Sequence, residues 1–349
     1  MQALVIQESA ADKPLNECIR FASVPDCREP GPGEARVRTL ASALNHLDLW
    51  VARGVPGLNL TYPRISGCDA CGVVESVGAG VDPAWIGKKV VLNAAFETSA
   101  HRRPGQPGEF LSSASYELIG EHHNGVHCQQ FCAPVNNLAT VAESTNPAHA
   151  AAFGLTFLTA YSMMVTKAGL RPGMLVLVTG IGGGVALAAL AIAKLWGCRV
   201  VVTSRHAWKL EKARSLGADE GVLDTGTDWS RAVREWSGKR GVDLAVDSSG
   251  KATHLSCIKS LARGGAYVTP GCTSGPDATT DLARIFWNQL RIFGSTMGSN
   301  DEFAEVVALF NAGRLAPVVD TVLPCQRGVE AFERLAKGEQ FGKVVLTWA

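Results

Sequence analysis

The sequence predicts an α/β fold in which a doubly wound parallel sheet accompanies a β-rich part of the chain. Of the 349 residues, 46% are hydrophobic and 19% are charged, which suffices for a large core in about two domains. Pro and Gly punctuate the first 120 residues, whereas strand-like and helix-like segments alternate from about residue 150. Such an alternation is typical of a parallel sheet covered by helices on both faces.

Two segments predict strands in the β-rich part. Polar and apolar side chains alternate over Ala35–Leu40, as in a strand with one buried face. Residues 72–78 form a second predicted strand, which ends in a glycine-containing turn. Residues 101–108 are polar and rich in Pro and Gly, so we expect a surface loop there.

The alternating part begins with the apolar run Met174–Thr179, which is typical of a buried parallel strand. The charge-free stretch 172–193 contains four glycines near its centre, which favours a strand, a turn and a helix over a membrane span. The predicted strands are 174–179, 199–203, 221–223, 242–247, 266–269 and 290–294. The predicted helices are 185–196, 207–216, 229–237 and 252–261. Two more helices and a final strand, 343–347, are expected after residue 303.

The composition disfavours several classes of partner. The chain has 33 Lys and Arg against 32 Asp and Glu, so it lacks a basic field that would attract nucleic acid or anionic lipid. Its ten cysteines are too few for a disulfide scaffold of this length. The first residues do not form the basic and apolar regions of a secretory signal. We therefore expect a cytoplasmic protein with free thiols that binds neither nucleic acid nor a membrane.

A glycine-rich turn predicts a dinucleotide site. The segment 180–186 lies between a predicted strand and a predicted helix, where backbone N–H groups would face a pyrophosphate. The third position of the usual glycine pattern falls on Val185 or Ala186, and alanine there is compatible with close helix–strand packing. The expected cofactor contacts in this turn are Gly180, Gly182, Gly183, Gly184 and Val185.

The end of the second strand of the sheet favours NADP over NAD. An NAD enzyme has an acidic residue there that binds the ribose 2′-hydroxyl, but this chain has no carboxylate before Glu211. Ser204, Arg205 and Lys209 instead offer a hydroxyl and two cations to a 2′-phosphate. The alternative is that Arg205 and Lys209 are solvated charges at the start of a helix.

Seven segments besides the glycine turn carry a family resemblance: 30–37, 43–49, 63–74, 155–161, 216–219, 293–298 and 341–346. Together they resemble the medium-chain dehydrogenase/reductase superfamily, which contains zinc alcohol dehydrogenases and zinc-free quinone reductases. The resemblance implies a GroES-like β-rich catalytic domain formed by residues 1–150 and 300–349. A Rossmann domain, residues 151–299, would be inserted into it, with the active site in the cleft.

The resemblance also implies that this chain lacks the zinc sites of the family. The catalytic zinc of the family is held by a Cys, a His and a third Cys or Asp, with a Glu beside the His. The corresponding residues here are Asn45, Cys68 and Leu155, with Asp69 in place of the Glu. An amide, one thiol and a leucine do not provide the three protein ligands of a zinc site. The matching stretch for the structural zinc, 93–120, has no cysteine, so zinc is not expected.

Two other segments contain metal-ligand residue types. Cys68–Cys71 is formally a C-x-x-C motif, but its extended context lacks the helix N-terminus that lowers the pKa of a redox thiol. Residues 121–128 contain three histidines and Cys128. The resemblance implies a glycine turn and a strand here, in which alternate side chains point to opposite faces and do not converge. We therefore expect no second metal site.

Without zinc, an enone or quinone is easier to reduce than an alcohol is to oxidise. The oxygen that becomes negative during reduction needs only a hydrogen bond or a proton. Zinc-free relatives with a similar Asn-x-x-Asp segment mostly reduce such substrates with NADPH, and we expect this activity, on a quinone, an enone or a related carbonyl. One alternative is a zinc alcohol dehydrogenase with an atypical ligand set: Cys68, Asp69 and a histidine such as His46. Another is a non-catalytic NADPH-binding protein.

Four residues are candidates for the catalytic site: Asn45, Asp48, Cys68 and Asp69. Asn45 is expected to bind the substrate oxygen or the nicotinamide carboxamide, and Asp48 to brace its loop. Tyr62 is either a proton donor or part of a turn. The further expected cofactor contacts are Thr159, Gly271, Met297 and Lys343, of which Thr159 and Lys343 resemble family positions near the nicotinamide.

The sixth predicted strand, 290–294, is apolar and ends the sheet. Relatives of this architecture commonly pair this strand edge to edge, and an uncovered sheet edge invites such pairing. We therefore expect a homodimer or a tetramer of dimers.

Overall fold

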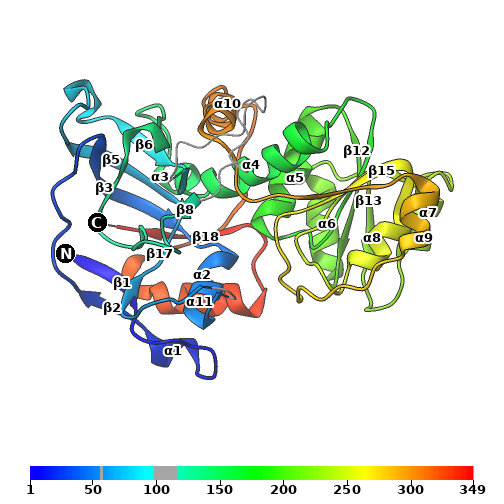
Figure 1. Cartoon of the computed structure of the whole chain (residues 1–349), viewed down its shortest axis with the longest axis horizontal. Helices are drawn as coiled ribbons and strands as arrows, with labels where there is room; N and C mark the ends of the chain where they lie inside the picture. Colours follow the sequence, from blue (N-terminus) through cyan, green and yellow to red (C-terminus); the bar gives the residue numbers. More distant parts are fainter. Residues whose placement is uncertain (56–57, 98–115, 349) are drawn as a thin grey trace. The chain divides into compact units, whose positions relative to one another are not determined.

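The computed structural model describes residues 1–55, 58–97 and 116–348, and the chain forms two compact units (Figure 1). Unit 1 comprises Met1–Leu155, Ser299–Ala312 and Pro317–Ala349, and unit 2 comprises Thr156–Gly298 and Gly313–Ala316. Both ends of the chain therefore belong to unit 1. The loop expected at residues 101–108 lies outside the described residues.

Unit 1 is built around a seven-stranded sheet. Its strands run in the order β10 (Leu138–Thr140), β6 (Lys89–Leu92), β5 (Ala70–Val77), β3 (Glu34–Ala43), β18 (Lys343–Thr347) and β17 (Val319–Pro324), and β9 (Gln130–Pro134) also pairs with β3. The strands expected near residues 35–40, 72–78 and 343–347 are thus present. Strand β17 was not expected from the sequence. It is partly exposed and pairs with β18 in parallel, with a shift in register.

Two smaller sheets complete the β structure of unit 1. One contains β2 (Ile19–Ser23), β1 (Gln2–Ile6) and β4 (Arg64–Ile65), and the other contains β7 (Ala95–Glu97) and β8 (Tyr116–Leu118). The helices are α1 (Leu15–Cys18), α2 (His46–Arg53), α3 (Pro147–Ala151), α10 (Asn300–Asn311) and α11 (Gly328–Lys337), with 3-10 turns at Pro83–Trp85, Val135–Asn137 and Cys325–Arg327. A core that includes Leu4, Leu49, Phe332 and Leu346 joins β1, α2, α11 and β18. This core fixes the start of α2 beside β18.

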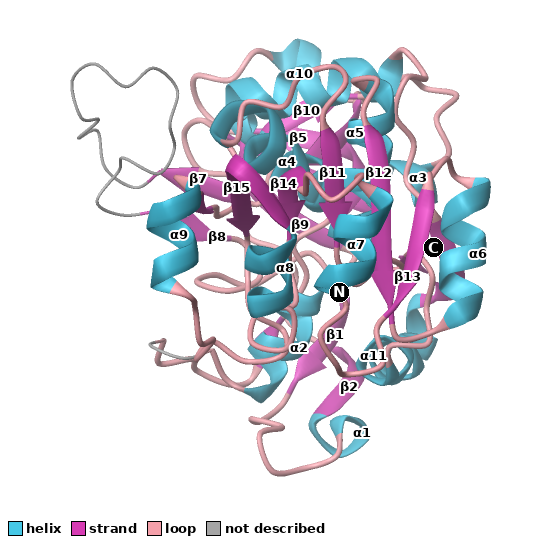
Figure 2. Ribbon diagram, turned by 90° about the vertical axis from the view of Figure 1, so that its right-hand side faces the viewer, coloured by secondary structure: helices cyan, strands magenta, loops and turns pink. Residues whose placement is uncertain are grey.

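Unit 2 contains a six-stranded sheet whose neighbouring strands are all parallel. The order is β13 (Glu220–Leu223), β12 (Arg199–Ser204), β11 (Leu175–Val178), β14 (Val242–Val246), β15 (Leu261–Thr269) and β16 (Arg291–Gly294). Its helices, which accompany the strands in Figure 2, are α5 (Gly184–Leu195), α6 (Ala207–Ser215), α7 (Ser230–Trp236), α8 (His254–Ser260) and α9 (Leu282–Asn288). Helix α4 (Gly154–Tyr161) and a π-helix (Ser162–Lys167) precede the sheet in sequence. The predicted doubly wound sheet is confirmed.

One local prediction is wrong, because residues 121–128 form turns rather than a strand. The backbone of this segment bonds to the end of β4 and to the loop that follows it, since Gly125 donates to the Ile65 carbonyl and His127 donates to the Ser66 carbonyl. A Cβ atom on Gly125 would lie 2.3 Å from the Ser66 backbone, so only glycine permits this close approach. Because the segment packs this closely as a series of turns, its side chains do not alternate between two faces as they would in the expected strand.

The apolar stretch 172–193 forms β11, the glycine turn and most of α5, as expected. Among the described residues, no helix is long and apolar enough to cross a membrane.

We predict that the chain forms a dimer through β16, an edge strand of the sheet in unit 2. Its Ile292 side chain is 46% exposed, and the nearby helix α9 exposes three large apolar side chains, Leu282, Phe286 and Trp287. Light scattering of the purified chain should give a dimer mass, or a multiple of it, at micromolar concentration. Ile292→Lys should shift the mass toward the monomer, because an edge lysine opposes strand pairing.

Leu223→Lys is the matched control, since Leu223 is 45% exposed on β13 at the opposite edge of the same sheet. This variant should keep the wild-type mass. A monomeric wild-type chain, or equal dissociation of both variants, would rule out pairing through β16.

Candidate functional site

Asn45 is the N-cap residue of α2, and a side chain of that helix binds its backbone. Its backbone N–H donates to Asp48 Oδ2 at 2.7 Å, and the two residues form a capping box. Both side chains are buried. Asp48 therefore anchors the backbone of Asn45, and the amide side chain of Asn45 extends toward the end of the loop that precedes β5.

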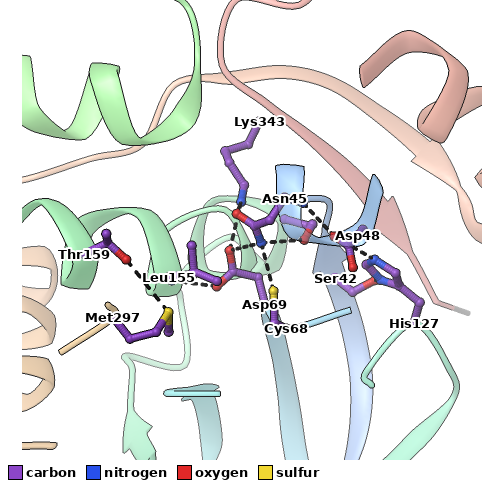
Figure 3. A network of polar contacts seen from close by, with 11 residues as sticks. Ser42, Asn45, Asp48, Cys68, Asp69, His127, Leu155, Thr159, Met297 and Lys343 are labelled. Carbon is purple, nitrogen blue, oxygen red and sulfur yellow. Dashed lines mark hydrogen bonds and ion pairs between the residues drawn. The ribbon is translucent and has the colours of Figure 1, made fainter. Parts of the chain in front are cut away.

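Four buried side chains of unit 1 form one hydrogen-bonded group, which we call the Lys343 cluster: Asn45, Cys68, Asp69 and Lys343 (Figure 3). Lys343 Nζ donates to Asp69 Oδ2 at 2.8 Å and to Asn45 Oδ1 at 2.5 Å. Asn45 Nδ2 donates to Asp69 Oδ2 at 2.9 Å and lies 3.4 Å from Cys68 Sγ. Each of the four residues is at most 6% exposed. The structure thus brings together three of the four expected catalytic residues and adds Lys343 to them.

The charges of the cluster balance within it. Asp69 accepts a further contact through Oδ1, to which the backbone N–H of Leu155 donates at 2.7 Å. A buried ion pair is tolerated only when its remaining polar atoms are also bonded, and both carboxylate oxygens of Asp69 meet this condition. Leu155 therefore contributes its backbone to the site, and not its side chain.

Burial raises the pKa of the Cys68 thiol well above its usual value, and the nearby carboxylates of Asp48 and Asp69 raise it further. Lys343 and the hydrogen bond from Asn45 act in the opposite direction but do not compensate. Cys68 is therefore a protonated thiol near neutral pH. The thiolate is the form that attacks electrophiles, so Cys68 is poorly suited to act as a nucleophile.

A second buried polar group adjoins Asp48 and was missed by the sequence analysis. His127 lies with Nε2 3.6 Å from Asp48 Oδ2 and Nδ1 2.8 Å from Ser42 Oγ. Trp348 Nε1 also donates to Ser42 Oγ, at 2.8 Å. These residues come from β3, a turn and the C-terminal end of the chain, and no sequence pattern relates them.

Two residues considered from sequence lie outside the cluster. The Tyr62 hydroxyl donates to the Val51 carbonyl at 2.8 Å, so it secures the backbone of α2. The His46 side chain is exposed and packs edge-on against Trp50, with 5.4 Å between ring centroids. In the described part of the chain, no group of three or more His, Cys, Asp or Glu side chains is placed to hold a metal ion.

The glycine turn of unit 2 has the backbone that a pyrophosphate site requires. Gly180 and Gly182 have φ values of +63° and +112°, which favour glycine, and Gly183 is the N-cap of α5. A Cβ on Gly183 would meet only one atom within 4 Å, the Gly180 carbonyl oxygen at 3.7 Å. Val185 lies in the first turn of α5. The space beside Gly183, at the N-terminus of α5, suits an anionic group.

The remaining expected cofactor contacts in unit 2 lie at two places. At the end of β12, Ser204 is buried and its Oγ accepts from the His206 N–H at 3.1 Å, while Arg205 is exposed. Lys209 is buried, with Nζ 5.3 Å from the Trp208 ring centroid.

After β15 and β16, two loops hold the other expected contacts. The Gly271 carbonyl accepts from Thr269 Oγ1 at 2.7 Å. Met297 has a φ of +49°, and its sulfur accepts from Thr159 Oγ1 at 3.8 Å. Lys343, by contrast, belongs to unit 1 and is occupied by Asp69 and Asn45.

Comparisons with known proteins agree over most of the chain. Residues 31–143 match the model of the alcohol dehydrogenase GroES-like domain, and residues 184–312 match that of the zinc-binding dehydrogenases. The chain is 30% identical over 332 residues to the zinc-type alcohol dehydrogenase-like protein YogA of Leptosphaeria maculans, with 91% of each chain covered. It is 28% identical over 315 residues to an alcohol dehydrogenase of Geobacillus stearothermophilus, covering 90% of this chain and 92% of that protein.

Solved structures show the same similarity. The crystal structure of an NAD-dependent alcohol dehydrogenase is 40% identical and superimposes with a TM-score of 0.92 over 100% of both chains. The crotonyl-CoA carboxylase/reductase AntE, solved in complex with NADP, has a TM-score of 0.89 over 99% of this chain and 94% of its own. Its 22% identity supports the fold alone.

We predict that Lys343→Met lowers the free energy of unfolding by roughly 3–5 kcal/mol, because it leaves the buried Asp69 carboxylate without a cation. The double variant Asp69→Asn/Lys343→Met should be more stable than Lys343→Met, since neither charge remains. Urea unfolding of the variants measures both effects.

Lys13→Met is the control, because the ion pair of Lys13 with Glu8 is exposed to solvent and should contribute little to the free energy of unfolding. If Lys343→Met is no more destabilising than Lys13→Met, the buried ion pair does not support the site.

Proposed function

Because this chain belongs to the medium-chain dehydrogenase/reductase superfamily, we propose that it is an NADPH-dependent reductase of a quinone, an enone or a related carbonyl that works without catalytic zinc. The 30% identical relative, which the chain matches over 91% of its length, establishes the family. The expected GroES-like and Rossmann architecture and the class of NAD(P)H-dependent oxidoreductases are confirmed with it. The substrate class, the choice of NADPH and the independence from zinc are our proposals.

The Lys343 cluster is the observation that carries the proposal. The positions that correspond to the zinc ligands of the family hold Asn45, Cys68 and Leu155. Asn45 is hydrogen-bonded at both ends, Cys68 has a raised pKa, and Leu155 offers only a backbone N–H, which Asp69 uses. The Lys343 ammonium group, 2.5 Å from Asn45 Oδ1, would repel a divalent cation from the same place. This donor set does not fit zinc.

Asn45 is the residue that we assign to the substrate oxygen. Lys343 donates to the carbonyl end of the Asn45 amide, which polarises the amide and strengthens its N–H groups as donors. One hydrogen of Nδ2 is directed to Asp69 at 2.9 Å, whereas the other contacts of Nδ2, to Cys68 and the Ala43 carbonyl, are long at 3.4 Å. The second hydrogen, which has only these long contacts, is the one that we assign to an oxygen that becomes negative as it is reduced.

The other residues of the cluster position Asn45. Asp69 and Lys343 fix the rotation of the amide from two sides, and Asp48 fixes its backbone. NADPH, when bound, would supply the hydride. The residues that would hold it are those of the glycine turn, with Ser204, Arg205 and Lys209 toward the 2′-phosphate and Thr159, Gly271 and Met297 toward the nicotinamide. We further propose that the enzyme acts in the cytoplasm, as a dimer, on a small molecule.

An alcohol dehydrogenase reaction is the second candidate, and the names of the relatives favour it. Three similar proteins are named alcohol dehydrogenases or alcohol dehydrogenase-like. This reaction would need another stabiliser of the alkoxide in place of a Lewis acid. The two candidate functions can be distinguished by their substrates, because the first requires turnover of quinones or enones and the second requires turnover of alcohols and aldehydes.

The proposal predicts that the purified chain oxidises NADPH in the presence of simple quinones or enones. Asn45→Ala should lower kcat by roughly 10²-fold, the usual effect of removing one donor to a developing oxyanion. The decrease in NADPH absorbance gives the turnover rates of the wild-type chain and of Asn45→Ala over a panel of quinones, enones and aldehydes.

Asn137→Ala is the matched control, since Asn137 is also a buried amide of unit 1 but donates to the Asn93 and Ala95 carbonyls and not to a residue of the cluster. It should retain kcat. Turnover of alcohols and aldehydes alone would favour the second candidate, and an unchanged kcat in Asn45→Ala would remove Asn45 from the reaction.

We also predict that Arg205→Ala weakens NADPH binding by about 1.5–3 kcal/mol, the range of a charged hydrogen bond, and leaves NADH binding nearly unchanged. Titration calorimetry with both cofactors measures the difference, and Arg231→Ala, which removes an exposed arginine on α7, controls for net charge. The 40% identical structure is named NAD-dependent, so this experiment decides the cofactor. Equal losses for NADPH and NADH would refute the role of Arg205.

A further inference from the structure

Two cysteines far apart in sequence touch each other on unit 1, away from the Lys343 cluster. Cys27 lies in the connection between β2 and β3, and Cys132 lies in β9. Their Sγ atoms are 3.6 Å apart although 105 positions separate the two residues. Both side chains are partly exposed. A disulfide bond has an S–S length of about 2.05 Å, so the two sulfur atoms need to approach only a little further to bond.

The contact is held in place from both sides. Arg28, next to Cys27, makes two hydrogen bonds to the Glu34 carboxylate, at 2.5 and 2.7 Å. Glu34 begins β3, and β3 pairs with β9 so that Arg36 lies opposite Cys132. The connection that carries Cys27 is thus fixed to the same pair of strands that carries Cys132, and the thiols do not meet by chance.

The surroundings of the pair favour a thiolate on Cys27. The hydrogen bond between the two thiols lowers the pKa of Cys27, burial opposes this effect, and the guanidinium groups of Arg36 and Arg28 lower the pKa further. Cys132 is the partner that keeps its proton, because its pKa is raised by the same hydrogen bond. Low thiol pKa and access to solvent are the two properties that make a cysteine reactive toward oxidants.

We propose that Cys27 and Cys132 are a reversible disulfide site that hydroperoxides oxidise. The Cys27 thiolate attacks one oxygen of hydrogen peroxide, which forms Cys27 sulfenic acid and releases hydroxide. Cys132 then attacks the Cys27 sulfur, the S–S bond forms as the S–O bond breaks, and the sulfenic hydroxyl group leaves with the Cys132 proton as water. The two thiols lose two electrons in total, and one peroxide is reduced to two molecules of water once hydroxide is protonated. A cellular thiol reverses the bond by exchange.

The other cysteines do not compete for this bond. Cys128 precedes β9 in the sequence, but it is 1% exposed and its thiol donates to the Gln130 carbonyl at 3.1 Å. Burial raises the pKa of Cys128 to about 12. Cys272 is exposed but belongs to unit 2. The site therefore consists of Cys27 and Cys132 alone.

The test is oxidation of the purified full-length chain with a small excess of hydrogen peroxide, followed by alkylation of the remaining thiols and peptide mass mapping. We expect one cross-linked peptide pair that contains Cys27 and Cys132, lost again after treatment with a thiol reductant. The cross-link closes a long loop, so the oxidised chain should melt on the order of 5 °C higher than the reduced chain.

Two variants test the order of the steps. In Cys132→Ser the sulfenic acid on Cys27 cannot be resolved, so dimedone should trap it and the melting temperature should not rise. Cys27→Ser should give neither the cross-link nor a trapped sulfenic acid at residue 132. Cys272→Ser, the control, should form the cross-link as the wild type does.

Three results would overturn the proposal. The first is oxidation of Cys272 under conditions that leave Cys27 reduced. The second is oxidation of Cys27 to sulfinic acid without a bond to Cys132. The third is a cross-link between Cys27 and any other cysteine. Because this site lies outside the Lys343 cluster, none of these outcomes bears on the proposed reductase activity.

Discussion

The structure of the site depends on one buried ion pair, between the Lys343 ammonium and the Asp69 carboxylate. The pair is 2.8 Å long and almost inaccessible to solvent, so removing one of the two charges leaves the other buried without a partner, which is strongly destabilising. Asp69 lies just before β5 and Lys343 is the first residue of β18, on either side of β3 in the sheet. The ion pair therefore links the N-terminal and C-terminal parts of unit 1, and both of its members contact Asn45.

This arrangement suits an amide at Asn45, which the sequence resemblance aligns with a metal ligand of the family. Asn45 lies between a cation and an anion that the chain itself supplies, and its orientation is set by both. The Cys68 thiol beside it stays protonated because its surroundings are dry and already contain two carboxylates. A polarised amide with one weakly bonded hydrogen suits the reduction of a carbonyl or quinone oxygen better than the binding of a metal.

Unit 2 was readable from sequence because buried parallel strands appear as apolar runs between helices, and all six predicted strands are present. In the site, the resemblance to a family pointed to Asn45, Cys68 and Asp69. It did not reveal that Lys343 pairs with Asp69, 274 positions away, because such a contact follows from the register of β3 with its neighbours. His127 was missed for the same reason, and the strand expected around it gave way to turns packed against the loop before β5.

We propose that the positive charge at the Lys343 cluster comes from Lys343 and not from a metal ion. The most direct measurement is the metal content of the purified chain, determined by elemental analysis, together with its turnover of NADPH before and after dialysis against a strong chelator. We expect no stoichiometric zinc and the same turnover in both preparations. One zinc ion per chain, with activity that is lost on chelation and restored by added zinc, would contradict it.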